Sequence, residues 1–226
     1  GKNILVDACI GSGKTTTIQV LCDELPDKKI LYLTYNKLLK VDAKSKINSR
    51  NAYVSNYHGF ACFVLKNNKI PFSGVSELIE IFNENSDKIQ IDPYDLLLID
   101  EYQDIENETA EMLNIIKQRN QHIQIIAVGD MMQKVYDKTT LDVSQFINNF
   151  LGDHENLTFT TCFRLNAEYA SRLGNIWKKP IKGVNENCQI KIMKYYEIKK
   201  IEQILLEHDN SDILCLGSRI GQMTDL

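Results

Sequence analysis

The chain has 226 residues, of which 43% are hydrophobic and 25% are charged, and its net charge at pH 7 is −4. These proportions are ordinary for a globular protein and exclude a disordered, collagen-like or coiled-coil chain. No apolar run approaches the roughly 20 residues that cross a bilayer, and no secretory signal opens the chain, so we expect no membrane association. The negative charge excludes a globally basic nucleic-acid coat and leaves room for a local basic groove.

The cysteines are widely spaced and form no C-x-x-C pair. They are Cys9, Cys22, Cys62, Cys162, Cys188 and Cys215. A disulfide scaffold or a zinc site is therefore not expected, and the favoured interpretation is a cytoplasmic protein with reduced thiols.

Short apolar runs alternate with longer amphipathic segments along the first 130 residues. Continuous apolar character, typical of strands buried on both faces, predicts strands at residues 3–8, 29–34, 51–55, 95–99 and 123–128. Helices are predicted at residues 14–24, 37–46, 57–66 and 106–118. This alternation predicts a doubly wound α/β fold with a parallel sheet and helices on both faces. Ligands bind such sheets at the carboxyl ends of the strands.

The segment at residues 67–93 contains Pro71, Gly74 and Pro93, which predicts a short helical excursion at most. A second series of elements follows, predicted as a strand at 157–160, a helix at 167–178, a strand at 189–193, a helix at 198–208 and a strand at 212–216. We therefore expect one domain at residues 1–150 and the beginning of a second α/β unit at residues 151–226. That second sheet is too short to close its core, so the chain is expected to end within the unit.

The first candidate site, A-C-I-G-S-G-K-T, joins a predicted strand to a predicted helix. It matches the phosphate-loop pattern G-x-x-x-x-G-K-[ST], with Ala8 in place of the first glycine. Gly11 and Gly13 allow backbone N–H groups to turn toward an anion, and the helix adds its positive end. Lys14 supplies a cation for the outer phosphates, and the Thr15 hydroxyl is a ligand for Mg²⁺. The alternative is a glycine-rich turn that binds nothing.

The second candidate site is a pair of carboxylates, Asp100 and Glu101, that ends an apolar predicted strand. Desolvating carboxylates without partners is costly, so their position needs a reason. Beside a phosphate loop, we expect Asp100 to hold Mg²⁺ and Glu101 to orient and deprotonate a water. The alternative is an exposed acidic helix cap. A third polar strand end contains Gln133, whose amide is a candidate sensor of the γ-phosphate, although turn residues after strands are common.

In order, the phosphate loop, D-E-Y-Q-D at residues 100–104 and G-D-M-M-Q-K-V-Y at residues 129–136 resemble the motifs of superfamily 1 helicases, specifically the UvrD/Rep-like DNA helicases. The resemblance implies RecA-like P-loop NTPase units that hydrolyse ATP with Mg²⁺ and move 3′ to 5′ on single-stranded or partly duplex DNA. It implies catalytic roles for Lys14, Glu101, Gln133 and Arg164. The nucleotide-binding residues that it implies are Ala8, Gly11, Ser12, Gly13, Lys14, Thr15, Thr16, Asp100 and Phe163, with Thr15 and Asp100 as magnesium ligands.

T-T-C-F-R at residues 160–164 resembles the start of the family's motif IV. In that motif an aromatic ring stacks on adenine and an arginine reaches the γ-phosphate, and the resemblance implies these roles for Phe163 and Arg164. T-Y-N-K at residues 34–37 and N-Y-H-G-F-A at residues 56–61 resemble two DNA-contacting motifs. The DNA-binding residues that they imply, together with the end of the third motif, are Tyr35, Asn36, Lys37, Tyr57, His58 and Tyr136. From the residues alone, an aromatic ring beside Asn and Lys is a candidate base-stacking platform. A tyrosine packed at a helix start and a capping or core histidine are the alternatives.

The family's motifs V and VI and its upstream glutamine motif are absent from this sequence, and the segment between His58 and Asp100 is shorter than the family's inserted subdomain. We therefore expect these residues alone to bind nucleotide with little unwinding. Two other functions stay open: a nucleotide-binding regulatory or docking module without motor activity, and an RNA-directed superfamily 1 helicase. No pattern in the sequence identifies a protein partner.

Overall fold

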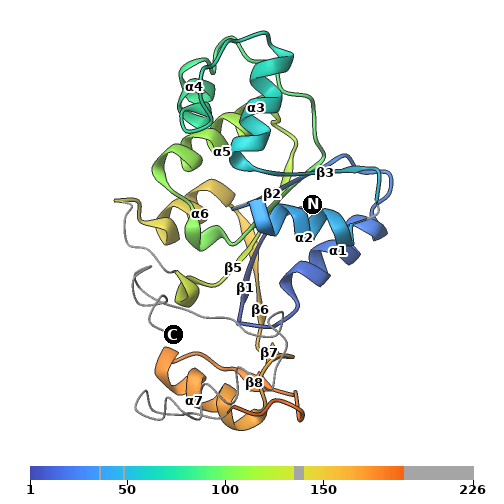
Figure 1. Cartoon of the computed structure of the whole chain (residues 1–226), viewed down its shortest axis with the longest axis vertical. Coiled ribbons are helices and arrows are strands. Elements are labelled where there is room, and N and C mark those ends of the chain that lie inside the picture. Colours follow the sequence, from blue (N-terminus) through green and yellow to red (C-terminus); the bar gives the residue numbers. More distant parts are fainter. Residues whose placement is uncertain (36, 48, 135–139, 191–226) are drawn as a thin grey trace, which may run out of the picture. The chain divides into compact units, whose positions relative to one another are not determined.

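A six-stranded parallel sheet, with strand order β3-β2-β4-β5-β1-β6, is the centre of the fold in the computed structural model (Figure 1). The structure describes residues 1–35, 37–47, 49–134 and 140–190. The strands of this sheet are β1 (Asn3–Ala8), β2 (Ile30–Thr34), β3 (Ala52–Asn56), β4 (Leu96–Asp100), β5 (Gln124–Gly129) and β6 (His154–Phe159). The predicted α/β fold with a parallel sheet is confirmed.

The helices within the described residues are α1 (Lys14–Glu24), α2 (Lys37–Lys46), α3 (Tyr57–Asn67), α4 (Leu78–Glu84), α5 (Asn107–Arg119), α6 (Val143–Leu151) and α7 (Ala167–Trp177). A second small sheet pairs β7 (Thr161–Cys162) with β8 (Lys182–Gly183). The predicted helix at 167–178 is confirmed, and α4 is the short excursion expected within 67–93. Helix α6 was not predicted, although Asp142 caps its N-terminus by accepting a hydrogen bond from the Gln145 N–H, a common start signal.

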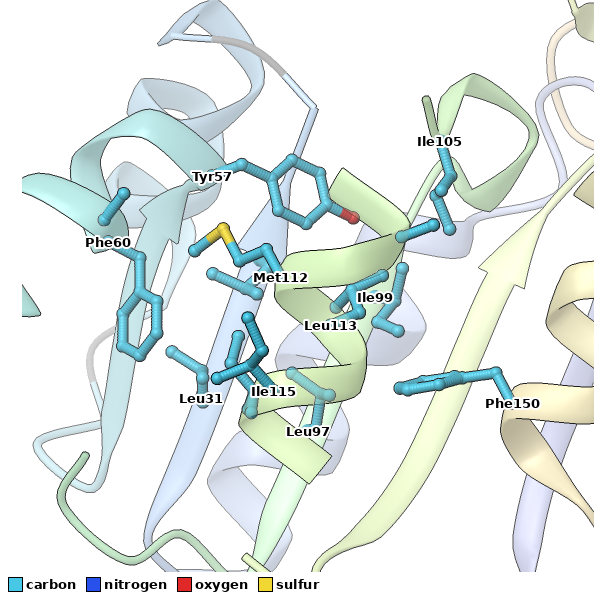
Figure 2. Packing of buried hydrophobic residues seen from close by; sticks show 14 of the residues in the cluster. Leu31, Tyr57, Phe60, Leu97, Ile99, Ile105, Met112, Leu113, Ile115 and Phe150 are labelled. Carbon is cyan, nitrogen blue, oxygen red and sulfur yellow. The ribbon is translucent and has the colours of Figure 1, made fainter. Parts of the chain in front are cut away.

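Side chains alternate between the two faces of the sheet, and each face has its own apolar cluster. Leu31, Leu97 and Ile99 face α3, α4, α5 and α6, and Figure 2 shows them against Met112 and Leu113 of α5. Their sequence neighbours, such as Tyr32 and Leu98, face α1 and α2 on the other side. Because both faces are covered at the centre of the sheet, β4 and β5 are apolar along their length, and their polar residues lie only at the strand ends.

The strand predicted to open a second sheet at residues 157–160 is instead the sixth strand of the first sheet. This strand, β6, begins at His154 and pairs in parallel with β1 along its whole length. The placement in a second sheet was wrong because pairing with β6 satisfies the backbone N–H and C=O groups along one side of β1, a contact that the local sequence pattern does not mark. The division at residue 150 into two RecA-like units stays a prediction.

Contacts divide the chain into two compact units, Gly1–Cys188 and Gln189–Leu226. All the elements described above belong to the first unit. The strands and the helix predicted between 189 and 216 fall almost wholly outside the described residues. Within the described part of the chain, no helix has both the length and the apolar character needed to cross a bilayer.

Candidate active site

A pocket of about 680 Å³ lies at the carboxyl end of the parallel sheet, a volume within the range of cofactor sites. The loops that follow β1, β4, β5 and β7 all contribute to it. Its lining consists of Ile10, Gly11, Ser12, Gly13, Lys14, Thr15, Thr16, Leu39, Asp42, Lys46, Glu101, Gln133, Phe163, Arg164 and Asn185. The structure thus brings the four residues predicted as catalytic to one pocket, together with most of the predicted nucleotide-binding residues.

The loop between β1 and α1 has a backbone that only glycine adopts readily. Gly11 and Gly13 have φ angles of 63° and 84°, in the left-handed region. Space also matters at Gly11, where an added Cβ would lie 2.7 Å from the Cβ of Arg164. Helix α1 begins at Lys14 without a side-chain cap within the described residues, so its first N–H groups are available to an anion.

Ala8, the last residue of β1, and Ser12 in the loop are both buried. Ala8 is fully buried at the end of β1, opposite Phe159 of β6, which accounts for a small side chain where the phosphate-loop pattern has glycine. The Ser12 hydroxyl is also buried, and among the described residues it finds no hydrogen-bond partner. A buried polar atom without a partner is costly, so this hydroxyl is a candidate contact for a bound ligand.

Asp100 is the last residue of β4 and is only 3% exposed. Its two oxygens are held separately: the Tyr32 hydroxyl donates to Oδ2 at 2.8 Å, and the Glu101 N–H donates to Oδ1 at 3.0 Å. Burial, and then the neighbouring charge of Glu101, raise the pKa of Asp100 to about 6. Such a carboxylate destabilises the fold when it is charged, which is typical of a group kept for chemistry.

Glu101 places its carboxylate in the pocket through an unusual backbone conformation, with φ at 53° in a residue other than glycine. Strain of this kind concentrates at functional sites. Its Oε2 lies 3.7 Å from Nζ of Lys14 and accepts a hydrogen bond from Nε2 of Gln103 at 2.8 Å. Gln103, which is 2% exposed, also accepts from the Asp130 N–H at 3.0 Å and so links the loops after β4 and β5. This role of Gln103 was not predicted, although it belongs to the D-E-Y-Q-D sequence.

Gln133 reaches the pocket from a short 3-10 turn after β5. Its Nε2 donates to Oδ2 of Asp130 at 2.8 Å. Asp130 is fully buried and has a further partner, the cationic Lys179, which donates to Oδ1 at 2.9 Å. Lys179 was missed in the sequence because it lies far along the chain in a segment without a recognisable motif.

Phe163 and Arg164 complete the pocket from the residues after β7. The Phe163 N–H donates to the carbonyl of Gly11 at 2.9 Å, which fixes this segment against the phosphate loop. The Phe163 ring is 62% exposed, an arrangement suited to stacking on a planar ligand. Asn185, another residue missed in the sequence, donates through Nδ2 to the carbonyl of Arg164 at 3.2 Å.

The residues predicted to contact DNA are not brought together in the same way. Tyr35 is exposed just after β2, Lys37 is exposed at the start of α2, and His58 is half-buried in the first turn of α3. Asn36 and Tyr136 lie outside the described residues. Tyr57 is only 3% exposed and packs in the core (Figure 2), so the prediction that its ring contacts DNA conflicts with its burial.

Two sequence comparisons relate this chain to known proteins. Residues 1–139 match the family model AAA_19, described as AAA domain. DNA helicase IV of Escherichia coli (strain K12) is 30% identical over 112 residues, which are 48% of this chain and 15% of that protein.

Two solved structures of a Bacteroides Pif1 helicase also match. The one in complex with ADP-AlF3 and single-stranded DNA has a TM-score of 0.47 and 16% identity, covering 96% of this chain and 60% of that chain. The one in complex with ADP-AlF4 has a TM-score of 0.45 and 17% identity, covering 77% and 42%. This chain therefore spans less than two thirds of each of these relatives. Because the family model matches more than half of its residues, the chain belongs to the AAA_19 family of AAA domains.

Proposed function

We propose that this chain is the ATP-binding core of a DNA helicase or translocase, which couples ATP hydrolysis to movement along single-stranded DNA. The observation that carries the proposal is the single pocket that collects Lys14, Glu101, Gln133 and Arg164. Phosphoryl transfer depends on positioning and on neutralising charge, and these four side chains supply the parts that it needs. The sequence likeness to DNA helicase IV supports DNA as the polymer.

In this proposal the phosphates of ATP lie along the loop from Gly11 to Thr16, against the backbone N–H groups at the start of α1. Lys14 neutralises the outer phosphates. The exposed ring of Phe163 stacks on the adenine, and Arg164 stabilises the charge that develops on the transferred phosphoryl group. The pocket of about 680 Å³ has room for a nucleotide of this size.

Mg²⁺ fits the residues present. The ion is usually held by one or two protein side chains plus waters and substrate phosphates, and no cluster of three or more acidic, cysteine or histidine ligands occurs in the described part of the chain. The hydroxyl of Thr15 and the carboxylate of Asp100 would hold it. Asp100 keeps acceptor positions for this purpose, because each of its oxygens accepts one hydrogen bond from the neighbouring residues described above and can accept another. Bound there, Mg²⁺ would neutralise charge on the phosphate oxygens.

Glu101 is the general base in this proposal. It sits in the pocket, 3.7 Å from the Lys14 ammonium, and its hydrogen bond from Gln103 fixes the carboxylate orientation. A positioned carboxylate of this kind takes the proton from an attacking water. Gln133 faces the same pocket from the neighbouring strand end and contacts the γ-phosphate through its amide.

The DNA-contacting surface is proposed to contain Tyr35, Lys37 and His58, with Asn36 and Tyr136 added from the resemblance alone. Movement in the 3′ to 5′ direction, a boundary near residue 150 and a second RecA-like unit from residue 151 belong to the same proposal. A cytoplasmic location is the remaining part, supported by the free cysteines of the described residues.

DNA-stimulated ATP hydrolysis by the whole protein tests this function, with Arg164→Ala compared with Arg172→Ala. Loss of an arginine finger lowers turnover by about 10³-fold or more, so Arg164→Ala should be nearly inactive. Arg172 is an exposed residue of α7 paired with Glu168, and its removal should leave turnover unchanged. Equal turnover in both variants would overturn the assignment of Arg164. Nucleotide binding without any stimulation by DNA would instead support a module without motor activity.

A further inference from the structure

Lys179 is a buried cation whose place in the proposed reaction is not yet assigned. Its side chain is 9% exposed, and its Nζ donates to Oδ1 of Asp7 at 2.6 Å and to Oδ1 of Asp130 at 2.9 Å. Asp7 lies in β1 just before the phosphate loop, and Asp130 follows β5. One ammonium group therefore joins two strand ends that flank the nucleotide pocket.

The backbone fixes Lys179 in this position. Helix α7 ends with Lys178 in the left-handed conformation, and the Lys179 N–H then donates to the carbonyl of Gly174 at 3.0 Å. Gly174 is needed for this close approach, since an added Cβ would lie 2.7 Å from the Lys179 carbonyl oxygen. The side chain is thus directed by a helix C-terminal turn, a common and rigid way to end a helix.

Asp130 connects Lys179 to Gln133 and is fully buried. A buried carboxylate without a cation is strongly unfavourable, so the ion pair with Lys179 offsets the cost of burying the Asp130 side chain. Burial alone lowers the pKa of Lys179, but its hydrogen bonds and charge interactions with Asp7 and Asp130 raise the pKa above the ordinary value. Lys179 is therefore charged at neutral pH.

Asp130 in turn orients the side chain of Gln133. Its Nε2 donates to Oδ2 of Asp130 at 2.8 Å, while the Met132 N–H donates to Oδ1 of the same carboxylate at 3.1 Å. With one end of its amide held in this way, the rest of the Gln133 amide has a defined direction in the pocket that it lines. The Asp130 backbone continues the path, because its N–H donates to Gln103, which holds Glu101.

From these contacts we infer that Lys179 is a positioning residue for recognition of the γ-phosphate, acting through Asp130 on Gln133. The inference rests on the proposed function, because it needs a nucleoside triphosphate in the pocket. It assigns a reaction-specific role to a residue in the segment after α7. A purely structural role, in which Lys179 only fastens β1 to β5, is the competing explanation.

The test is the preference of the chain for a non-hydrolysable ATP analogue over ADP, measured as two dissociation constants by calorimetry with AMP-PNP and ADP. Lys179→Met should reduce this preference by about tenfold, the value of a hydrogen bond to a charged group, and leave ADP affinity within about twofold. Lys178→Met is the matched control, because Lys178 is the exposed neighbour, and it should bind both nucleotides like the unaltered chain.

A double variant separates the two explanations. If Lys179 acts through Gln133, then Lys179→Met combined with Gln133→Ala should lose no more preference than Gln133→Ala alone. An unchanged preference in Lys179→Met, an equal loss of affinity for both nucleotides, or multiplied effects in the double variant would each overturn the inference.

Folding and the proposed function have separate readouts. If circular dichroism shows that Lys179→Met does not fold, Lys179→Gln takes its place, since its amide still donates to Asp130 without the charge; a lost ATP preference is again expected, and a retained one would overturn the inference. If the unaltered chain binds neither nucleotide, the proposed function itself fails and the inference fails with it. If it prefers AMP-PNP and the variants do too, only the inference fails.

Discussion

Strands β4 and β5 contain two regions that are equally buried and chemically opposite. Along most of their length they carry apolar side chains, such as Leu97 and Ile125, with no exposed area. Asp100 ends β4 and Asp130 directly follows β5, and these two residues are 3% and 0% exposed. Burial stabilises the fold in the first region and costs free energy in the second. The apolar stretch therefore holds the sheet together, whereas the buried acidic residues need another reason, which the proposed function supplies.

A change at the acidic end should alter the chemistry of the pocket, and Glu101→Gln is expected to have the largest such effect. Removing a general base lowers the hydrolysis rate by about 10²–10⁴-fold. Nucleotide affinity should stay within about threefold, because the glutamine oxygen still accepts the hydrogen bond from Gln103. Single-turnover hydrolysis by the whole protein and nucleotide titration measure the two quantities. A hydrolysis rate equal to that of the unaltered protein would remove Glu101 from the mechanism.

A substitution in the apolar region should instead lower the stability of the fold. Leu97→Ala removes a fully buried side chain from β4 and should lower the free energy of unfolding by about 2–5 kcal/mol, through lost burial and the cavity left behind. Leu38→Ala is the control, since Leu38 is 81% exposed and its loss should change stability by less than about 0.5 kcal/mol. Urea unfolding gives both values, and equal effects of the two substitutions would contradict the packing shown in Figure 2.

Two tyrosines that were both predicted to contact DNA differ in burial, and this difference predicts different effects of their substitution. Tyr35 is exposed, and Tyr35→Ala should weaken binding of single-stranded DNA by about 1–3 kcal/mol, the value of one stacked base. Tyr57→Phe should leave DNA binding unchanged, because the hydroxyl that it removes is buried in the core and cannot reach DNA. Its hydroxyl is buried without a partner among the described residues, so its removal should leave stability unchanged or raise it by about 1 kcal/mol. Fluorescence anisotropy with labelled DNA measures the affinity of both variants. Weaker binding by Tyr57→Phe would show that Tyr57 contacts DNA.

The smallest expected effect is a pH dependence at Asp104. Burial, and then the charges of Glu101 and Glu106, raise the pKa of this half-buried carboxyl to about 6. Between its ordinary pKa of about 4 and this raised value, the folded state binds more protons than the unfolded state, so this group lowers stability as pH rises through that range.

Asp104→Asn removes the ionisable carboxyl and with it this loss of stability. It should be more stable than the unaltered chain at pH 8 by roughly 1 kcal/mol, a value reduced to allow for solvent screening at a partly exposed site, and no more stable below about pH 4. Thermal unfolding at the two pH values measures the difference. A stability gain that is the same at both would show that the pKa of Asp104 is not raised.

The helices and strands of the first 130 residues were predictable because local signals agreed with the fold. The apolar runs match β1 to β5 within about two residues, the usual uncertainty of strand ends. The convergence of Lys14, Glu101 and Gln133 was also predictable, because the carboxyl ends of parallel strands meet at one edge of the sheet.

Other features depend on contacts that no local pattern records. Lys179 reaches Asp7 and Asp130 only through the tertiary fold, and the place of β6 beside β1 depends on an edge that the sequence does not mark. The burial of Tyr57 was available in principle. Tyr57, Phe60, Ala61 and Val64 follow the helical spacing of a buried face, and this periodicity is a stronger signal than the resemblance of a short motif.

Binding of a fluorescent ATP analogue with Mg²⁺, compared between the unaltered chain and Lys14→Ala, tests most directly whether the loop after β1 holds a triphosphate. We expect saturable binding by the unaltered chain and a loss of about 100-fold or more in affinity for Lys14→Ala, since a charge-assisted contact to phosphate is among the strongest in a protein. Thermal unfolding confirms that both proteins are folded. Equal affinity of the two folded proteins would contradict the proposed nucleotide site and the function built on it.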